Sequence, residues 1–243
     1  MKQVNNPLAV VVPAAGVGKR MKTSCPKQYL KIAQSTILEH TVLKLLSHPR
    51  ITQVIIALGE ADEYFPDTQL ANHTDVRIVT GGQERVDSVL AGLKAIDSSR
   101  FPWVLVHDAA RPCVTLSDIE KLIDACLNAQ QGGILALPVR DTMKRSEDSM
   151  VTETVERDNL WHALTPQMFP SELLIQAIEQ AISSGAMITD EASAIEFAGG
   201  QCQLVEGSSE NIKITRPDDL ALAEFILTKQ QSINDSSEQQ EQI

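Results

Sequence analysis

Short apolar runs alternate with longer amphipathic segments along most of this chain, which leaves few folds open to it. The runs are bounded by Gly, Pro or Asp and are too short to be typical helices. They occupy residues 8–12, 53–58, 76–79, 103–107, 133–138, 203–205 and 211–215. Such runs, separated by helices, are typical of a mostly parallel sheet covered on both faces. The sequence therefore predicts an α/β fold.

The segments between the runs carry helix start and stop signals. Ser117 and Glu120 have the spacing of a capping box, and Gly132 follows as a stop signal. Pro217 stands just before the last amphipathic segment, where a first-turn proline is tolerated. On these signals we expect helices at 36–47, 87–96, 117–129, 171–184, 190–197 and 218–229.

Length and composition fit one large domain. The chain has 243 residues, of which 43% are hydrophobic and 22% charged, enough apolar material for a complete core. We expect a single domain over residues 1–230. Residues 231–243 are mostly Gln, Ser, Glu and Asp, a composition that predicts a disordered polar tail.

One segment interrupts the alternation. Between Asp141 and Asp158, Thr and Val alternate loosely around a polar centre at residues 147–149, which predicts a solvent-exposed β-hairpin within residues 139–159. An isolated two-stranded arm is marginally stable in water. We therefore expect this arm to pack on the second subunit of a homodimer.

Charge and cysteine content exclude several classes of partner. Formal net charge is −11, so no overall positive field attracts nucleic acid or an anionic membrane, and an anionic ligand needs a local basic site. The four cysteines form no C-x-x-C pair, and no apolar stretch approaches the ~18 residues of a membrane span. We expect no signal peptide, no membrane span and a cytoplasmic location.

A local basic site follows the first predicted strand. Small residues at 13–16 (Pro-Ala-Ala-Gly) let backbone N–H groups approach a phosphate or a base edge. Between Ala14 and Ile32 there is no Asp or Glu, and the five basic residues are Lys19, Arg20, Lys22, Lys27 and Lys31. A solvated basic loop would explain the charge alone. Its place at the carboxyl end of a strand favours polyphosphate binding.

Further candidates follow other predicted strands. Asp108 and Arg111 come after 103–107, where Asp could hold a ribose hydroxyl or Mg²⁺ and Arg an anionic substrate. The structural alternative is an ion pair that fixes the loop. His107 lies within the strand, which favours a packed core residue over a base. Ser88 follows Gly81 and Gly82 at the start of a helix and is either a base contact or an ordinary first-turn residue.

Two late segments add polar residues. Lys213 lies between Ile212 and Ile214, so a strand would place it on the face opposite both, and a lysine inside a sheet usually needs an anion. Residues 189–191 (Thr-Asp-Glu) form a good helix start.

Taken in order, the motifs resemble those of the 2-C-methyl-D-erythritol 4-phosphate cytidylyltransferase family, which uses CTP in the non-mevalonate isoprenoid pathway. They run from Pro13 to Pro217: P-A-A-G-x-G-x-R-M, C-P-K-Q-Y, G-G-x-E-R-x-D-S-V, V-H-D-A-A-R-P, D-T-M-K-R, L-W-x-x-L-T-P-Q, T-D-E-A-S and N-I-K-x-T. Any one of these motifs is weak, whereas the series is specific. The resemblance implies a Rossmann-like sheet of the nucleotide-diphospho-sugar transferase type and a β-arm that embraces a second subunit.

The resemblance also implies roles for individual residues. The CTP-binding set is Pro13, Ala14, Ala15, Gly16, Gly82, Gln83, Ser88, Asp108 and Ala109. The catalytic cations are Arg20, Lys27 and Lys213. The residues for methylerythritol phosphate are Asp108, Arg111, Thr142, Arg157, Thr165, Thr189 and Lys213, with Thr142 and Arg157 acting in the neighbouring subunit. Gln83 departs from the Asp that family members often have, although its carbonyl can still accept from cytosine's amine.

The implied reaction is attack by the 4-phosphate oxygen of methylerythritol phosphate on the α-phosphorus of CTP, with pyrophosphate leaving. Both partners are anionic, so the reaction needs alignment and charge neutralisation more than a proton-transfer residue. Mg²⁺ would be held mainly by the CTP phosphates. The alternatives are a cytidylyltransferase for ribitol 5-phosphate or another polyol phosphate, and a non-catalytic nucleotide-binding dimer.

Overall fold

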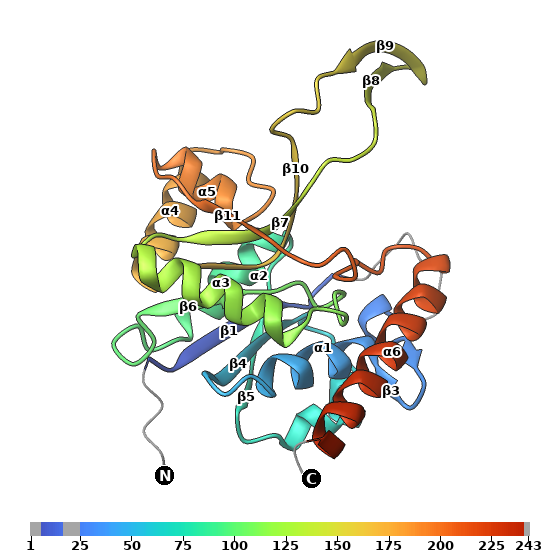
Figure 1. The fold of residues 1–243 in the computed structure, drawn as a ribbon. Coiled ribbons are helices and arrows are strands. Elements are labelled where there is room, and N and C mark those ends of the chain that lie inside the picture. Colours follow the sequence, from blue (N-terminus) through green and yellow to red (C-terminus); the bar gives the residue numbers. More distant parts are fainter. Residues whose placement is uncertain (1–5, 17–24, 241–243) are drawn as a thin grey trace.

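A seven-stranded sheet forms the centre of the computed structural model, which describes residues 6–16 and 25–240 (Figure 1). The strand order is β11-β7-β10-β6-β1-β4-β5, and neighbours are parallel except at β10, which runs antiparallel to β6 and β7. The strands are β1 (Leu8–Pro13), β4 (Ile51–Leu58), β5 (Val76–Thr80), β6 (Trp103–Val106), β7 (Gly133–Pro138), β10 (Trp161–Pro170) and β11 (Gln203–Glu206). The predicted α/β class is confirmed.

Helices cover both faces of the sheet. Along β1 the side chains of Val10 and Val12 face α1 (Ile37–Leu46) and α3 (Leu116–Ala129), and that of Val11 faces the opposite way. On that opposite face lie α2 (Arg85–Lys94), α4 (Ser171–Ser183) and α5 (Glu191–Phe197). Residues of β1 are completely buried on both faces, which is why its sequence is continuously apolar.

Smaller elements lie beside the sheet. Helix α6 (Asp218–Gln240) packs near the start of α1 and the short hairpin of β2 (Lys31–Ile32) and β3 (Ser35–Thr36). Short 3₁₀ turns are η2 (Lys27–Tyr29), η3 (Phe65–Asp67) and η4 (Gln69–Asn72). In the part of the chain that the structure describes, every helix is too short or too polar to cross a membrane.

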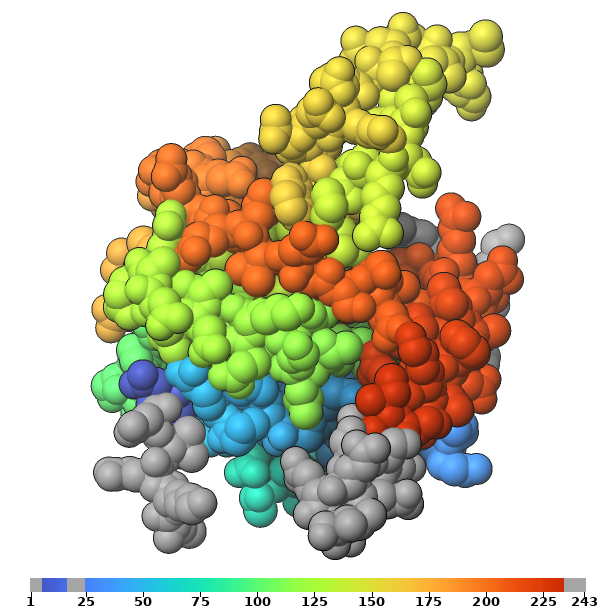
Figure 2. All heavy atoms as spheres, viewed as in Figure 1, coloured from blue at the N-terminus to red at the C-terminus, as the bar shows by residue number. Residues whose placement is uncertain are grey.

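The expected arm is present as a separate two-stranded ribbon of β8 (Met143–Glu147) and β9 (Met150–Val155). It extends the connection between β7 and β10, which are neighbours in the sheet, and it stands clear of the body in Figures 1 and 2. Asp148 and Ser149 form its turn with positive φ of 46° and 66°. Nearly all of the arm is exposed, including Met150 at 72% and Val151 at 63%.

The structure differs from the predicted strands at two places. Residues 211–215 form no strand, because the backbone beside them is the loop after β6: Ile214 N–H donates to Ala110 O at 2.8 Å, and no ladder follows. Strand β10 was not predicted, since Pro166 interrupts its apolar pattern and its pairing with β7 shifts register between Ala163 and Gln167.

Helix boundaries differ as well. Helix α2 begins at Arg85 rather than Asp87, because Asp87 Oδ2 accepts from Glu84 N–H at 3.0 Å and so occupies the third helical position. The cap of α3 is Thr115, whose hydroxyl accepts from Asp118 N–H, and not Ser117. Helix α6 continues to Gln240, whereas the polar composition predicted disorder from 231. The segment 231–240 contains no Gly or Pro and extends a helix already formed, so it has no nucleation cost.

Candidate active site

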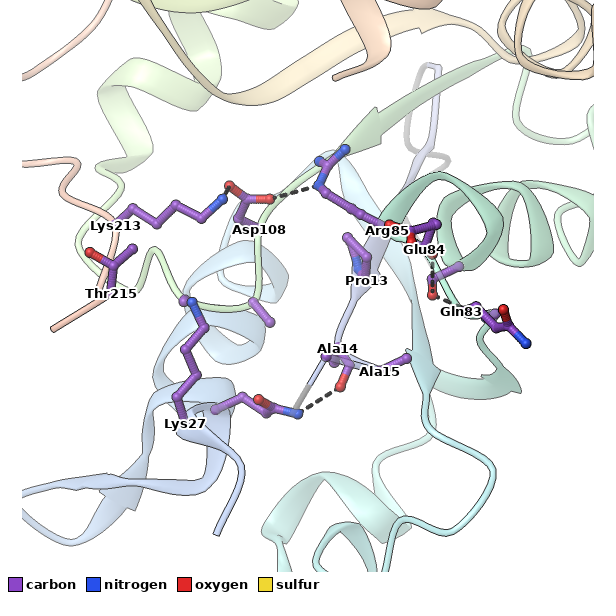
Figure 3. A pocket seen from close by; sticks show the side chains of 16 residues that line it. Pro13, Ala14, Ala15, Lys27, Gln83, Glu84, Arg85, Asp108, Lys213 and Thr215 are labelled. Atoms are coloured by element: carbon purple, nitrogen blue, oxygen red, sulfur yellow. Dashed lines mark hydrogen bonds and ion pairs between the residues drawn. The ribbon is translucent and has the colours of Figure 1, made fainter. Parts of the chain in front are cut away.

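A pocket of about 810 Å³ opens at the carboxyl ends of β1 and β6, close to the start of α2 (Figure 3). The chain runs from β1 outward through β4 to β5 and then returns to β6 on the other side of β1, so the pocket lies at a topological switch point. Its lining residues are Pro13, Ala14, Ala15, Gly16, Lys27, Gln28, Gly82, Gln83, Glu84, Arg85, Ser88, Asp108, Ala109, Ala110, Lys213 and Thr215. The structure thus brings together every described residue predicted to bind CTP.

The loop after β1 forms one wall of the pocket. Ala14 N–H donates to Ala57 O at 2.8 Å, which continues the pairing of β1 with β4 by one residue. The carbonyl of the same residue is bonded as well, because the buried Gln28 amide donates from Nε2 to Ala14 O at 2.7 Å. These two bonds fix the backbone of the loop. Because its side chains are small, a ligand can lie directly against that backbone.

The turn from Gly82 to Glu84 forms the opposite wall. A Cβ on Gly82 would lie 2.2 Å from Asp87 Cβ, so no other residue fits there. Ser88 is only 2% exposed, and its hydroxyl accepts from Gly82 N–H at 3.1 Å and donates to Glu84 O at 3.3 Å. Ser88 therefore shapes the turn from within, while Gln83 lies exposed at its tip.

Asp108 is the electrostatic centre of the pocket. Its Oδ1 accepts from Arg85 Nε at 3.1 Å, and its Oδ2 lies 2.8 Å from Lys213 Nζ (Figure 3). The same Oδ2 lies 3.4 Å from Arg111 Nε. Burial raises the pKa of this carboxyl, but the three cations more than offset burial and hold it far below its usual range. Asp108 is consequently a fixed anion.

Lys27 and Lys213 lie on one side of the pocket, and Gln83 and Glu84 lie on the other (Figure 3). Lys27 Nζ donates to Ile214 O at 3.0 Å, and Thr215 of the same late segment also lines the pocket. The segment 211–215 therefore brings one lysine to the site and supports the other. Arg20, the third predicted catalytic cation, lies outside the described residues.

Arg111 and Thr165 lie behind the pocket. Arg111 is 8% exposed and donates to Asn211 O at 2.7 Å in addition to Asp108, which matches the structural alternative of a loop-fixing pair. Burial lowers its pKa, and Asp108 opposes that effect. Thr165 is 4% exposed, and its hydroxyl accepts from Asp108 N–H at 3.0 Å. Both residues orient Asp108 rather than facing the cavity.

His107 is a core residue, as the sequence predicts. It is completely buried, and burial lowers its pKa to about 4. Nε2 lies 3.0 Å from Arg111 O, which can only accept, so Nε2 carries the proton. Nδ1 then accepts from the Thr165 hydroxyl at 3.1 Å.

Besides Arg111 and Thr165, three more predicted substrate residues lie outside this pocket. Thr142 and Arg157 are exposed at the base of the arm, where the Arg157 guanidinium donates to Arg140 O. Thr189 is exposed just before α5, and its N–H donates to Ser193 Oγ at 3.1 Å. Within this one chain they do not complete the site.

Sequence reasoning missed five lining residues: Gln28, Glu84, Arg85, Ala110 and Thr215. All five belong to motifs quoted above, but only their neighbours were assigned roles. Arg85 is the most heavily bonded of them, because it joins Asp108 to the buried Glu191. Among the residues that the structure describes, no three Asp, Glu, His or Cys side chains are grouped as a metal site.

Comparisons with known proteins agree with this geometry. The family model for 2-C-methyl-D-erythritol 4-phosphate cytidylyltransferase (IspD) matches residues 8–229. A curated protein of that name from Colwellia psychrerythraea is 61% identical over 230 residues, which cover 91% of this chain and 95% of the relative. One from Escherichia fergusonii is 55% identical over 231 residues, covering 94% and 97%.

Solved structures show the same fold. The crystal structure of the Francisella tularensis enzyme of that name matches with a TM-score of 0.78 at 37% identity, covering 90% of this chain and 99% of the other. The enzyme from Thermus thermophilus matches with a TM-score of 0.77 at 30% identity, covering 90% and 98%. These matches confirm the resemblance that the motifs indicated, and the chain belongs to the 2-C-methyl-D-erythritol 4-phosphate cytidylyltransferase family.

Proposed function

We propose that this protein transfers CMP from CTP to 2-C-methyl-D-erythritol 4-phosphate, giving 4-diphosphocytidyl-2-C-methyl-D-erythritol and pyrophosphate for isoprenoid precursor synthesis in the cytoplasm. Family membership supports the reaction. The observation that carries it is the gathering of Lys27, Lys213 and Arg85 around one pocket in a chain of net charge −11. A local positive site is what a triphosphate and a second phosphate need.

The chemistry requires no proton-transfer residue. The attacking phosphate oxygen of the substrate is already ionised at neutral pH, and negative charge shifts toward pyrophosphate as the bond to the α-phosphorus breaks. Lys27 and Lys213 would offset that charge, with Arg20 as a third cation. Their preorganised placement matters more than their basicity.

Mg²⁺ fits this site as a metal carried by the nucleotide. Asp108 is the carboxylate beside the cations, and both its oxygens already accept from Arg85, Lys213 or Arg111. It could offer a remaining lone pair, but the triphosphate would supply most ligands. When bound, Mg²⁺ neutralises charge on the phosphate oxygens.

Cytosine would be recognised by the backbone of the two walls. Carbonyl groups of the 13–16 loop and the 82–84 turn can accept from the exocyclic amine, and the Gln83 side-chain carbonyl can do the same. The ribose would lie near Asp108 and Ala109. This arrangement favours CTP over UTP, whose carbonyl oxygen would face other acceptors.

We further propose that the protein acts as a homodimer in which the arm of one subunit completes the site of the other. Three facts support this proposal: the arm is exposed on both faces, it carries Met150 and Val151 into solvent, and Thr142 and Arg157 do not line the pocket of their own chain. Arg157 suits a phosphate because its planar fork can bind two oxygens at once.

The reaction is tested by pyrophosphate release with CTP and methylerythritol phosphate, each omitted in turn. Release that needs both substrates supports the proposal. Turnover with ribitol 5-phosphate at equal or greater kcat/KM would instead identify a different polyol-phosphate enzyme, and nucleotide binding without turnover would identify a non-catalytic dimer.

The arm is tested by mixing two inactive variants, Arg157→Ala and Lys27→Ala, under conditions of subunit exchange. If Arg157 acts across the interface, each heterodimer has one site with both lesions and one with neither. Equal mixing should then restore about a quarter of wild-type activity per site. A matched control mixes Lys27→Ala with Lys213→Ala. Both lysines line the pocket of one chain, so every heterodimer site carries a lesion and no activity returns.

Failure of the first mixture to recover, with exchange shown independently, would place Arg157 in the site of its own subunit. Recovery in the control mixture would show that the lysines belong to different sites. Either result contradicts the proposed arrangement of the arm.

A further inference from the structure

Arg85 joins two carboxylates that come from separate parts of the fold. It is the first residue of α2, and its Nε donates to Asp108 Oδ1 at 3.1 Å. Its two terminal nitrogens donate to the two carboxylate oxygens of Glu191, at 2.6 Å and 3.2 Å. Glu191 is the first residue of α5. One guanidinium therefore connects the loop after β6 with two helices.

The carboxylates of this network are buried, although an ion pair that only links two helices can lie at the surface, as Lys94 and Glu179 do. The side chains of Glu191 and Asp108 are only 2% and 9% exposed, and that of Arg85 is 30% exposed. Burial raises the pKa of Glu191, and the guanidinium of Arg85 opposes that rise. Apolar residues of similar size often stabilise such a position equally well, so a buried ion pair calls for another explanation.

The two oxygens of Asp108 have different partners. Oδ1 accepts from Arg85, whereas Oδ2 faces Lys213 Nζ at 2.8 Å and Arg111 Nε at 3.4 Å. Lys213 is the most exposed of these cations, at 39%, and extends into the pocket (Figure 3). If Lys213 turns from Asp108 to a phosphate, the buried carboxylate loses one of its three cations. Its charge is then offset only by Arg85 and Arg111.

We propose that Arg85, held by Glu191, is a positioning residue that keeps Asp108 paired and in place while Lys213 moves between Asp108 and the reacting phosphates. The inference rests on the proposed function. Arg85 can hold Asp108 from Oδ1 without occupying the oxygen that Lys213 uses. Without Arg85, Asp108 depends more strongly on its ion pair with Lys213. The Lys213 ammonium then stays at Asp108 and is less available to the transferring phosphoryl group.

The test compares Arg85→Gln with the double variant Arg85→Gln and Glu191→Gln. The single variant leaves Glu191 buried without its cation, so we expect both the urea midpoint and kcat to fall. The double variant removes that unpaired carboxylate, and we expect it to regain most of the lost urea midpoint. Its kcat should stay low, about tenfold or more below wild type, because Asp108 still lacks Arg85. KM for CTP should change much less.

Arg85→Lys tests the role of the charge. An ammonium can pair with Asp108 but cannot reach both carboxylates as a fork does. We therefore expect a kcat between those of Arg85→Gln and wild type. A kcat no higher than that of Arg85→Gln would contradict a role through the charge on Asp108.

A second ion pair of α2 provides the matched control. Lys94 Nζ lies 2.7 Å from Glu179 Oε1 and ties α2 to α4, with both side chains about half exposed and neither lining the pocket. The double variant Lys94→Gln and Glu179→Gln should keep wild-type kcat. A fall in kcat equal to that of the Arg85 variants would show that any loosening of α2 slows the reaction.

The decisive result is whether the Arg85→Gln and Glu191→Gln double variant regains stability without regaining kcat. Recovery of kcat together with the urea midpoint in the Arg85 and Glu191 double variant would reduce the pair to a structural tie and overturn this inference. Every variant is compared with wild-type turnover of CTP and methylerythritol phosphate. If the wild-type protein shows no such turnover, the result counts against the proposed function instead.

Discussion

Replacing Lys213 with alanine separates the contribution of a pocket cation to catalysis from its contribution to folding. Asp108 would keep Arg85 at 3.1 Å and Arg111 at 3.4 Å after Lys213 is removed. The buried carboxylate therefore stays paired. Because the Lys213 side chain is 39% exposed, loss of its ion pair should cost about 1 kcal/mol of stability or less.

The cost to the transition state is larger. Charge on the transferring phosphoryl group is redistributed as the bond to pyrophosphate breaks, and Lys213 is placed to offset it. Loss of one positioned cation should raise the barrier by about 3 kcal/mol, which lowers kcat about a hundredfold. We expect KM for CTP to rise by a smaller factor. The predicted signature is thus a low kcat in a protein of nearly normal stability.

Steady-state pyrophosphate release gives kcat and KM, and urea unfolding gives the stability. Lys229 provides the control, because its Nζ lies 2.6 Å from Glu210 Oε1 in an exposed ion pair and it does not line the pocket. Lys229→Ala should keep wild-type kcat. Near-normal kcat with a raised KM in Lys213→Ala would refute the reasoning and make Lys213 a ground-state binding residue.

Four further outcomes are expected. Lys27→Ala should also lower kcat more than it raises KM for CTP, and the opposite pattern would assign Lys27 to binding alone. CTP should be preferred over UTP by roughly 1 to 3 kcal/mol for each unsatisfied base contact, so equal kcat/KM values would contradict backbone recognition of cytosine. Removal of divalent cations with EDTA should abolish turnover and added Mg²⁺ should restore it, whereas full activity in EDTA would exclude the proposed metal. His107 has a pKa lowered by burial to about 4, so between about pH 6.5 and pH 4 the unfolded chain binds more protons and stability falls as pH falls. By pH 4.5 this loss should reach roughly 2 to 3 kcal/mol. Urea midpoints at pH 7 and 4.5 should show a smaller loss in His107→Asn.

Much of the pocket could be predicted from the ends of the apolar runs alone. Parallel strands bring their carboxyl ends to one edge, so the residues after the first and fourth apolar runs were expected at that edge. Pro13 and Asp108 are at that edge because β1 and β6 are neighbours, paired at Val11 and Val106. The small residues at 13–16 follow the first apolar run, and this position identified them as a ligand-facing loop.

The positions behind the pocket depended on a strand that the pattern did not reveal. Strand β10 lies between β6 and β7, and this placement brings Thr165 beneath Asp108. Pro166 interrupts the apolar period of β10, so its burial was not visible in the sequence. Similarly, a spacing of three residues relates Asp108 to Arg111 but does not tell which of them faces the cavity.

Arg85 was missed because the predicted helix began two residues too late. With a start at Asp87, Arg85 belongs to the preceding turn, where its side chain has no defined direction. The capping bond from Glu84 N–H to Asp87 Oδ2 places Arg85 in the first turn of α2 instead. Its partner Glu191 is more than a hundred residues away in the chain. Only tertiary structure relates the two.

The balance of charges around Asp108 explains how the cations bonded to it can stay together before an anion arrives. Arg85, Arg111 and Lys213 face Asp108 and Glu191, so three positive charges meet two negative ones and the net charge of the group is one positive. A pocket with three unpaired cations would attract a triphosphate more strongly, but the repulsion among them would oppose folding. The observed set holds both arginines firmly and leaves the excess positive charge on the more exposed Lys213. Lys213 is therefore the cation that can exchange Asp108 for phosphate with least structural change.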